Sequence, residues 1–128
     1  MSSAIPDDIR RYLIQCVPSV PYIEAILLMR DGADAAWSAS SLGRRLYLAD
    51  EDAALLLARL KADSLVSIVP GAERHYRFAP ATQELERIWS QLAVVYARNL
   101  IEVSTLIHMN SVGKAQILAN AFVWRKEK

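Results

Sequence analysis

The middle third of the chain changes its apolar periodicity once, and this change constrains the fold more than any other feature. Between residues 42 and 60 the apolar side chains recur at steps of three and four, which is the period of a helix face. Residues 65–69 are then apolar and mostly β-branched, and residues 74–78 alternate polar and aromatic side chains, as a half-buried strand does. Pro70 and Gly71 between these runs are typical of a turn. The sequence therefore predicts helices followed by a β-hairpin.

Helix caps and breakers divide the rest of the chain into predicted helices. They span residues 6–17, 20–30, the segment after Ser38 that holds Leu42 and Leu46, 51–62, 82–107 and 112–124. Ser38 and Asp50 are the expected N-caps of the two central helices, since their side chains accept hydrogen bonds from free backbone N–H groups. The predicted fold class is mainly α with a small β-hairpin, with a long C-terminal helix and a short last helix.

The charge and cysteine content exclude several classes of protein. Lys and Arg number 15 against 14 Asp and Glu, so the net charge of +1 argues against a polybasic binder that acts through bulk electrostatics. The single cysteine, Cys16, excludes an internal disulfide framework and a multi-cysteine zinc site, and we expect it to be reduced and buried. The N-terminus lacks the features of a signal peptide, and the most apolar stretch is too short for a membrane helix. We therefore expect a cytoplasmic protein with no membrane partner.

The stretch LGRRLYLADEDAALLLARLKADSLV, residues 42–66, resembles the core of bacterial winged helix-turn-helix transcription regulators, MarR-like in style. Leu42 and Leu46 match the apolar pair of the first motif helix, and Leu48 matches the inward residue of the turn. The recognition helix of this pattern buries the positions of Ala53, Leu56, Leu57 and Leu60. The resemblance covers about residues 19–79. It implies a winged helix-turn-helix domain over residues 1–80 and a C-terminal helical segment over 81–128 that dimerises.

The same resemblance implies a surface for double-stranded DNA, with a helix in the major groove and the wing near phosphates. The residues expected at this surface are Arg44, Arg45, Glu51, Ala54, Leu55, Ala58, Arg59, Arg74 and Arg77. The outward face of the predicted recognition helix departs from the family, because it is aliphatic and acidic where polar side chains are usual. Asp50, Glu51 and Asp52 also stand at the end that would approach the phosphates, which they repel.

Two interpretations of the function follow from this conflict. The first, favoured by the resemblance, is a dimeric winged-helix transcription regulator that binds DNA. The second is a winged-helix adaptor that does not read DNA and contacts another protein through Glu51, Leu55, Ala58 and Ala62. The sequence holds no GxSxG, HExxH, P-loop or dinucleotide motif, and its two histidines and one cysteine lie far apart. We therefore expect no enzymatic activity, no cofactor and no metal.

The predicted helix over residues 82–107 is apolar around most of its circumference. A helix that covers one side of a small domain needs only a narrow apolar face, so the excess predicts a second packed surface. One interpretation is a homodimer interface; the other is that the N-terminal and last helices cover this surface within one chain. The expected interface residues are Leu85, Trp89, Leu92, Tyr96, Leu100, Val103 and Ile107.

Overall fold

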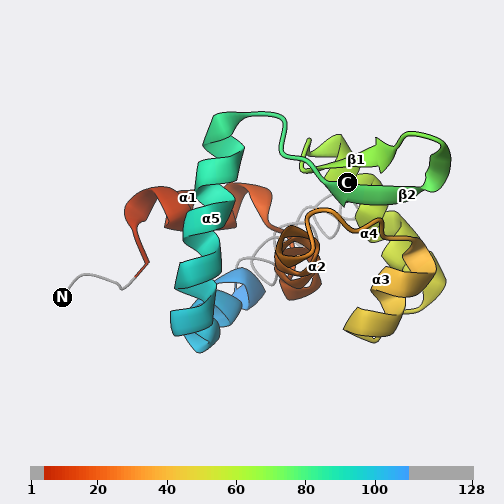
Figure 1. Ribbon diagram of the computed structural model, residues 1–128. Helices are drawn as coiled ribbons and strands as arrows, with labels where there is room; N and C mark the ends of the chain where they lie inside the picture. Colours follow the sequence, from red (N-terminus) through yellow and green to blue (C-terminus); the bar gives the residue numbers. More distant parts are fainter. Residues whose placement is uncertain (1–4, 110–128) are drawn as a thin grey trace, which may run out of the picture. The chain divides into compact units, whose positions relative to one another are not determined.

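The structure, a computed structural model, describes residues 5–109 of the 128-residue chain. In chain order the elements are α1 (Asp7–Cys16), α2 (Val20–Asp31), α3 (Ala39–Leu46), α4 (Asp50–Ala62), β1 (Val66–Val69), β2 (Ala72–Phe78), α5 (Gln83–Arg98) and a further helix over Leu100–Met109. The predicted fold class, mainly α with a small β-hairpin, is confirmed (Figure 1). The predicted last helix, residues 112–124, lies outside the described residues.

The described chain divides into two compact units. Residues 21–93 form one unit, and residues 5–20 together with 94–109 belong to the other. The first unit holds α2, α3, α4, β1 and β2 in the order expected for a winged helix-turn-helix. In this unit α3 and α4 pack side by side, and α4 contacts β1 (Figure 1).

The predicted cap of α3 is confirmed in atomic detail. The Ser41 backbone N–H donates to Ser38 Oγ at 3.1 Å, and the Ser38 backbone N–H donates to Ser41 Oγ at 2.9 Å. This reciprocal capping box satisfies two backbone donors that the first helical turn leaves unpaired. The helix ends at Tyr47, which takes a left-handed conformation with φ of 58°. The start and the end of α3 are therefore both fixed by local interactions.

The expected cap of α4 is wrong. Asp50 lies inside the first turn of the helix, and the N-cap position is held by Ala49, which has no side-chain acceptor. Ala49 takes an extended backbone conformation and its carbonyl accepts from the Ala53 N–H at 3.0 Å, so the backbone alone starts the helix. Asp50, Glu51 and Asp52 instead place negative charge near the positive end of the helix dipole.

Gly43 allows α3 and α4 to approach each other closely. A Cβ atom at this position would lie 2.7 Å from the Leu48 carbonyl oxygen and 3.4 Å from the Ala53 Cβ. The Leu48 N–H also donates to the Gly43 carbonyl at 2.8 Å, which closes the turn between the helices. Only a residue without a side chain fits between the turn and α4 without moving the backbone.

The hairpin pairs β1 and β2 in an antiparallel register with one irregularity. Val66 stands opposite Phe78 and Ile68 opposite Tyr76, but the register shifts between Ile68 and Val69. The extra β2 residues form a bulge, a feature that re-aims side chains near the end of a strand. Trp37, ahead of α3, also pairs with Tyr76 through two backbone hydrogen bonds of 2.8 Å. This pairing of Trp37 with the outer edge of the hairpin was not predicted from the sequence.

The core of the 21–93 unit confirms most of the predicted inward residues. Ala53, Leu57 and Leu60 of α4 are buried with Leu42 of α3, whereas Leu56 is only half-buried. Asp63 joins the end of α4 to α2, because its carboxylate accepts a hydrogen bond of 2.6 Å from the Tyr22 hydroxyl. Burial of the aliphatic face is the main free-energy term that holds such a small unit together.

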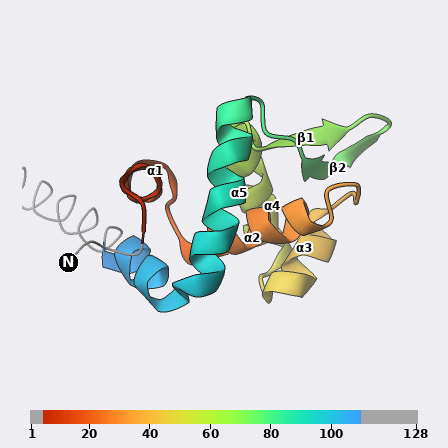
Figure 2. The same ribbon diagram turned by 60° about the vertical axis from the view of Figure 1, so that its left-hand side comes forward.

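The single long helix predicted over residues 82–107 is wrong. Helix α5 ends at Arg98, and a second helix begins at Leu100, with a change of direction between them (Figure 2). Asn99 lies at the break. Its side-chain amide donates to the Val95 backbone carbonyl at 3.2 Å, and its backbone carbonyl accepts from the Val103 N–H at 3.0 Å. Asparagine side chains compete with the backbone in this way and favour helix caps over helix interiors.

In the unit formed by residues 5–20 and 94–109, the cysteine is placed differently from the prediction. Cys16, expected to be buried, is exposed at the end of α1, whereas Ile9 and Leu13 are buried. The apolar stripe of α1 therefore runs through Ile9 and Leu13, and Cys16 falls beside it. Arg10 and Glu102 form an ion pair of 3.7 Å between half-exposed side chains, a contact of low energy in water.

Candidate functional site

The outward face of α4 is aliphatic and acidic, as the sequence predicts. Glu51, Ala54, Ala58 and Arg59 are exposed, and Leu55 is 71% exposed. The helical period places Glu51, Leu55 and Ala58 on the side opposite the buried Leu57. Leu55 and the neighbouring alanines thus give this face of α4 a small exposed apolar surface.

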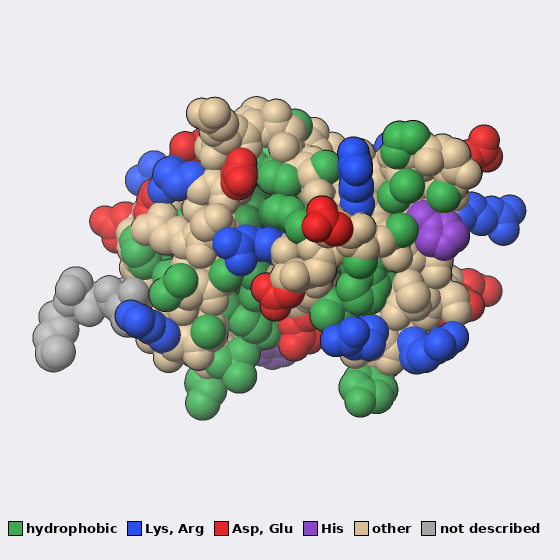
Figure 3. All heavy atoms as spheres, in the orientation of Figure 1, with side chains coloured by type: hydrophobic (Ala, Val, Ile, Leu, Met, Phe, Trp, Pro, Cys, Tyr) green, Lys and Arg blue, Asp and Glu red, His purple; other side chains and the backbone are tan. Residues whose placement is uncertain are grey.

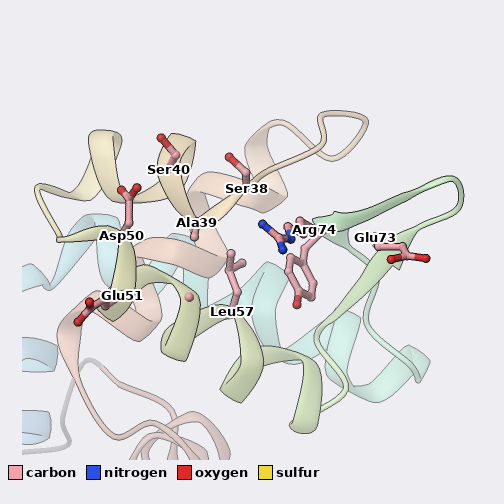
Figure 4. A pocket seen from close by; sticks show the side chains of 10 residues that line it. Ser38, Ala39, Ser40, Asp50, Glu51, Leu57, Glu73 and Arg74 are labelled. Carbon is pink, nitrogen blue, oxygen red and sulfur yellow. The ribbon is translucent and has the colours of Figure 1, made fainter.

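A groove opens beside this face, between α3, α4 and the hairpin. Its volume is about 540 Å³, and its lining residues are Ser38, Ala39, Ser40, Asp50, Glu51, Ala54, Leu57, Glu73, Arg74 and Tyr76 (Figure 4). Every lining residue belongs to the 21–93 unit, so the groove is a property of that unit alone. The volume falls in the range of about 300–1,000 Å³ that is typical of pockets for compact ligands.

The secondary structure explains why these residues meet. Asp50, Ala54 and Leu57 recur at steps of four and three residues, so they form one side of α4, and Glu51 lies at the edge of that side. Leu57 is buried and forms the floor of the groove. The pairing of Tyr76 with Trp37 holds the β1–β2 hairpin beside the start of α3.

Four charged side chains line the groove and give it a net charge of −2. These are the carboxylates of Asp50, Glu51 and Glu73 and the guanidinium of Arg74. Within residues 5–109 none of them makes a hydrogen bond or an ion pair through its side chain. Asp50 and Glu51 lie at the start of α4, whereas Arg74 lies across the groove on β2 (Figure 4). Two carboxylates, Asp50 and Glu51, thus lie on the α4 side of the groove, and Arg74 and Glu73 lie on the β2 side.

The arginines expected to contact DNA phosphates differ in their surroundings. The Nε atom of Arg59 donates to the Asp63 carboxylate at 3.0 Å, and the guanidinium of Arg45 lies 5.9 Å from the centre of the Trp37 ring. Arg74 lines the groove, and Arg44 and Arg77 are exposed. Over α3, α4 and β2, Figure 3 shows basic side chains scattered among acidic and hydrophobic ones, with no continuous basic band on this face.

The residues expected at a dimer interface are divided by their burial. Trp89, Leu92, Val103 and Ile107 are buried. Leu85 and Tyr96 are half-buried, and Leu100 is 51% exposed. Trp89 is held by the Tyr22 ring, with 6.3 Å between ring centroids.

The groove itself was not predicted from the sequence. Glu51, Ala54 and Arg74 were expected together at a surface for DNA, without Glu73, Tyr76 or the serines that begin α3. The side-chain alternation of β2 was visible in the sequence, yet the bulge that changes its register was not. A groove built from two helix starts and an irregular strand has no signature of its own in the sequence.

Comparison with protein-family models, curated proteins and solved structures finds no match to this chain. Among residues 5–109, no cluster of three or more His, Cys, Asp or Glu side chains is arranged to hold a metal ion. In the same range, no single helix is long and apolar enough to cross a membrane, and only α1 and α2 taken together across their break reach that length and composition. The groove and the adjoining face of α4 are therefore the features on which a function can be argued.

Proposed function

We propose that residues 21–93 act as a winged-helix protein-interaction module that does not read DNA. The exposed face of α4 carries this proposal, because Leu55 is 71% exposed beside Ala54 and Ala58. When another apolar surface covers alanine and leucine side chains, their removal from water lowers the free energy of the complex. The same side chains have no donor or acceptor for the edges of bases in the major groove.

The charge around α4 supports the same proposal. Three carboxylates stand in its first turn, at the end of a recognition helix that approaches the DNA backbone. Phosphate contacts supply much of the affinity of DNA-binding proteins, and carboxylates at this position oppose them. Arg59, an exposed cation of α4, is paired with Asp63. This charge distribution favours a protein partner over a phosphate backbone.

A second candidate function is a DNA-binding transcription regulator, active as a homodimer. The exposed arginines support this candidate, since Arg44 lies near the end of α3 and Arg77 on the wing strand. Both positions are near the DNA backbone in winged helix-turn-helix complexes of the resembled family. This candidate requires that the two arginines outweigh the carboxylates of α4.

A photo-crosslinking experiment separates the two candidates. Leu55→p-benzoylphenylalanine, introduced into the full chain in its native cells, is expected to crosslink to one defined protein under illumination. The matched control places the same residue at Glu24, an exposed position on α2 outside the groove. A protein crosslink at position 55 that is absent at position 24 supports the interaction module. Crosslinks to DNA at position 55, or no protein crosslink there, contradict it.

A direct binding assay completes the test. The purified full chain is titrated into fluorescent random-sequence duplex DNA at several low salt concentrations, where electrostatic affinity is greatest. The proposal predicts no saturable binding. Saturable binding that weakens in Arg44→Ala and Arg77→Ala, with a shallower dependence on salt, favours the DNA-binding regulator.

A further inference from the structure

We infer that the groove between α3, α4 and β2 binds a protein segment in which lysine or arginine residues flank an aliphatic side chain. This inference rests on the proposed function and identifies the chemistry of the partner. Among the ten lining residues, Leu57 forms an apolar floor, and four charged side chains from α4 and β2 lie around it (Figure 4).

The charges select a cationic partner. Asp50, Glu51 and Glu73 outnumber Arg74 three to one, and none of the four is neutralised by a side chain within residues 5–109. A positive group at the start of α4 is attracted by the carboxylates of Asp50 and Glu51, which both line the groove. An acidic segment meets repulsion at the same place. Complementary charge of this kind determines specificity more than total affinity.

The floor selects an aliphatic residue next to the cation. Leu57 is 1% exposed, and Ala39, Ala54 and Tyr76 complete the apolar part of the lining. Ala54 has only a methyl group, so space remains above it for a side chain of the partner. Leu55, one residue further along α4, extends the apolar surface outside the groove.

Arg74 gives the bound segment a direction. It lies across the groove from Asp50 and Glu51, on β2 (Figure 4). Its guanidinium is suited to a backbone carbonyl or a carboxylate of the partner, because it presents several donors in a fixed plane. The cation of the partner is therefore expected at the start of α4, and its acceptor beside the wing.

Three capped five-residue peptides test the inference on the full chain. The probes are Lys-Leu-Lys-Leu-Lys, Glu-Leu-Glu-Leu-Glu and Lys-Ser-Lys-Ser-Lys, each with a fluorescent label. Fluorescence anisotropy gives the dissociation constants, and ¹H–¹⁵N spectra report which backbone amides shift. We expect the first peptide to bind at least about five-fold more tightly than either of the others. Its shifts are expected at residues 38–40, 50–57 and 73–76.

Charge-neutralising variants supply changes of opposite sign. Asp50→Asn with Glu51→Gln is expected to weaken binding of the lysine–leucine peptide about ten-fold, whereas Arg74→Gln strengthens it about three-fold. The matched control is Glu24→Gln with Asp31→Asn, which removes two exposed carboxylates of the same unit outside the groove. General loss of structure cannot produce both directions of change, and dispersed spectra verify that each variant is folded.

The possible results separate the inference from the proposed function. Equal binding of the lysine–leucine and glutamate–leucine peptides, or shifts confined to amides outside the groove, overturns the inference. The Leu55 crosslink to a protein then still stands as support for the interaction module. If the peptide binds as expected while Leu55 crosslinks only to DNA, the groove retains its ligand chemistry and the proposed function fails.

Discussion

Helices α3 and α4 pack against each other in one small unit, but their surfaces and ends are built differently. Helix α3 starts with a capping box at Ser38 and ends at a left-handed residue, and its exposed C-terminal residues Arg44 and Arg45 are basic. Helix α4 starts without a side-chain cap, carries three acids in its first turn and exposes Leu55. The two helices share a packing interface and differ in nearly everything that faces solvent.

This difference shows that packing and function place separate demands on neighbouring helices. The inward residues Leu42, Gly43, Ala53 and Leu57 are buried where α3 and α4 pack, whatever the outward residues are. The outward residues of α4 are then free to become acidic and aliphatic without a cost to the fold. A fold by itself therefore does not establish which partner its surface binds.

The largest expected effect separates the two faces of α4. Leu57→Ala should lower the free energy of unfolding by about 2–5 kcal/mol, because it removes buried methyl groups and leaves a cavity. Leu55→Ala, the matched change two residues away, should alter it by less than about 0.5 kcal/mol, since this side chain is already in water. Urea unfolding of both variants measures the difference. Similar losses in both variants would show that Leu55 is also part of the core.

The next effect concerns the contact between the two helices. Gly43→Ala should lower the free energy of unfolding by about 1–3 kcal/mol, because the new methyl group meets a backbone carbonyl that must move. Gly32→Ala is the control, since its nearest neighbour would lie 3.6 Å away in ordinary contact. A loss at Gly32 as large as that at Gly43 would contradict the close approach described here.

The caps of the two helices give a smaller effect with opposite signs. Ser38→Ala should lower the free energy of unfolding by about 1 kcal/mol, through loss of the capping box. Ala49→Ser should raise it by about 0.5–1 kcal/mol, because it adds an acceptor to the uncapped start of α4. Thermal unfolding followed by circular dichroism measures both changes, with Ser40→Ala as the exposed control. A neutral Ala49→Ser variant would mean that the acids of the first turn already satisfy these backbone donors.

The smallest effect concerns the exposed ion pair at the end of α4. Arg59→Ala should lower the free energy of unfolding by about 0.3–0.5 kcal/mol at low salt, and less at high salt, because the pair with Asp63 is open to solvent. Lys61→Ala, which removes an exposed cation without an ion pair in the described part of the chain, is the control. Urea unfolding at two ionic strengths measures both, and identical salt responses would argue against the ion pair.

Most of the local structure could be predicted from individual residues. Ser38 revealed the start of α3, Pro70 and Gly71 revealed the turn of the hairpin, and the spacing of Ala53, Leu57 and Leu60 revealed the buried face of α4. The failures occurred where two local signals competed. Apolar residues on both sides of Asn99 favoured one long helix, but α5 ends at Arg98 and the next helix begins at Leu100. Asp50 was a plausible cap, yet the backbone at Ala49 begins the helix one residue earlier.

By itself the sequence determined the helical class, the hairpin and the acidic, aliphatic character of the outward face of α4. These properties follow from periodicity and side-chain chemistry over a few neighbouring residues. Only the tertiary structure decided that Glu73, Arg74 and Tyr76 stand across a groove from Asp50 and Glu51, and that Trp89 and Val103 are buried. The reason is that such contacts join residues more than twenty positions apart. Their geometry depends on the β2 bulge, the Trp37 pairing and the packing at Gly43 acting together.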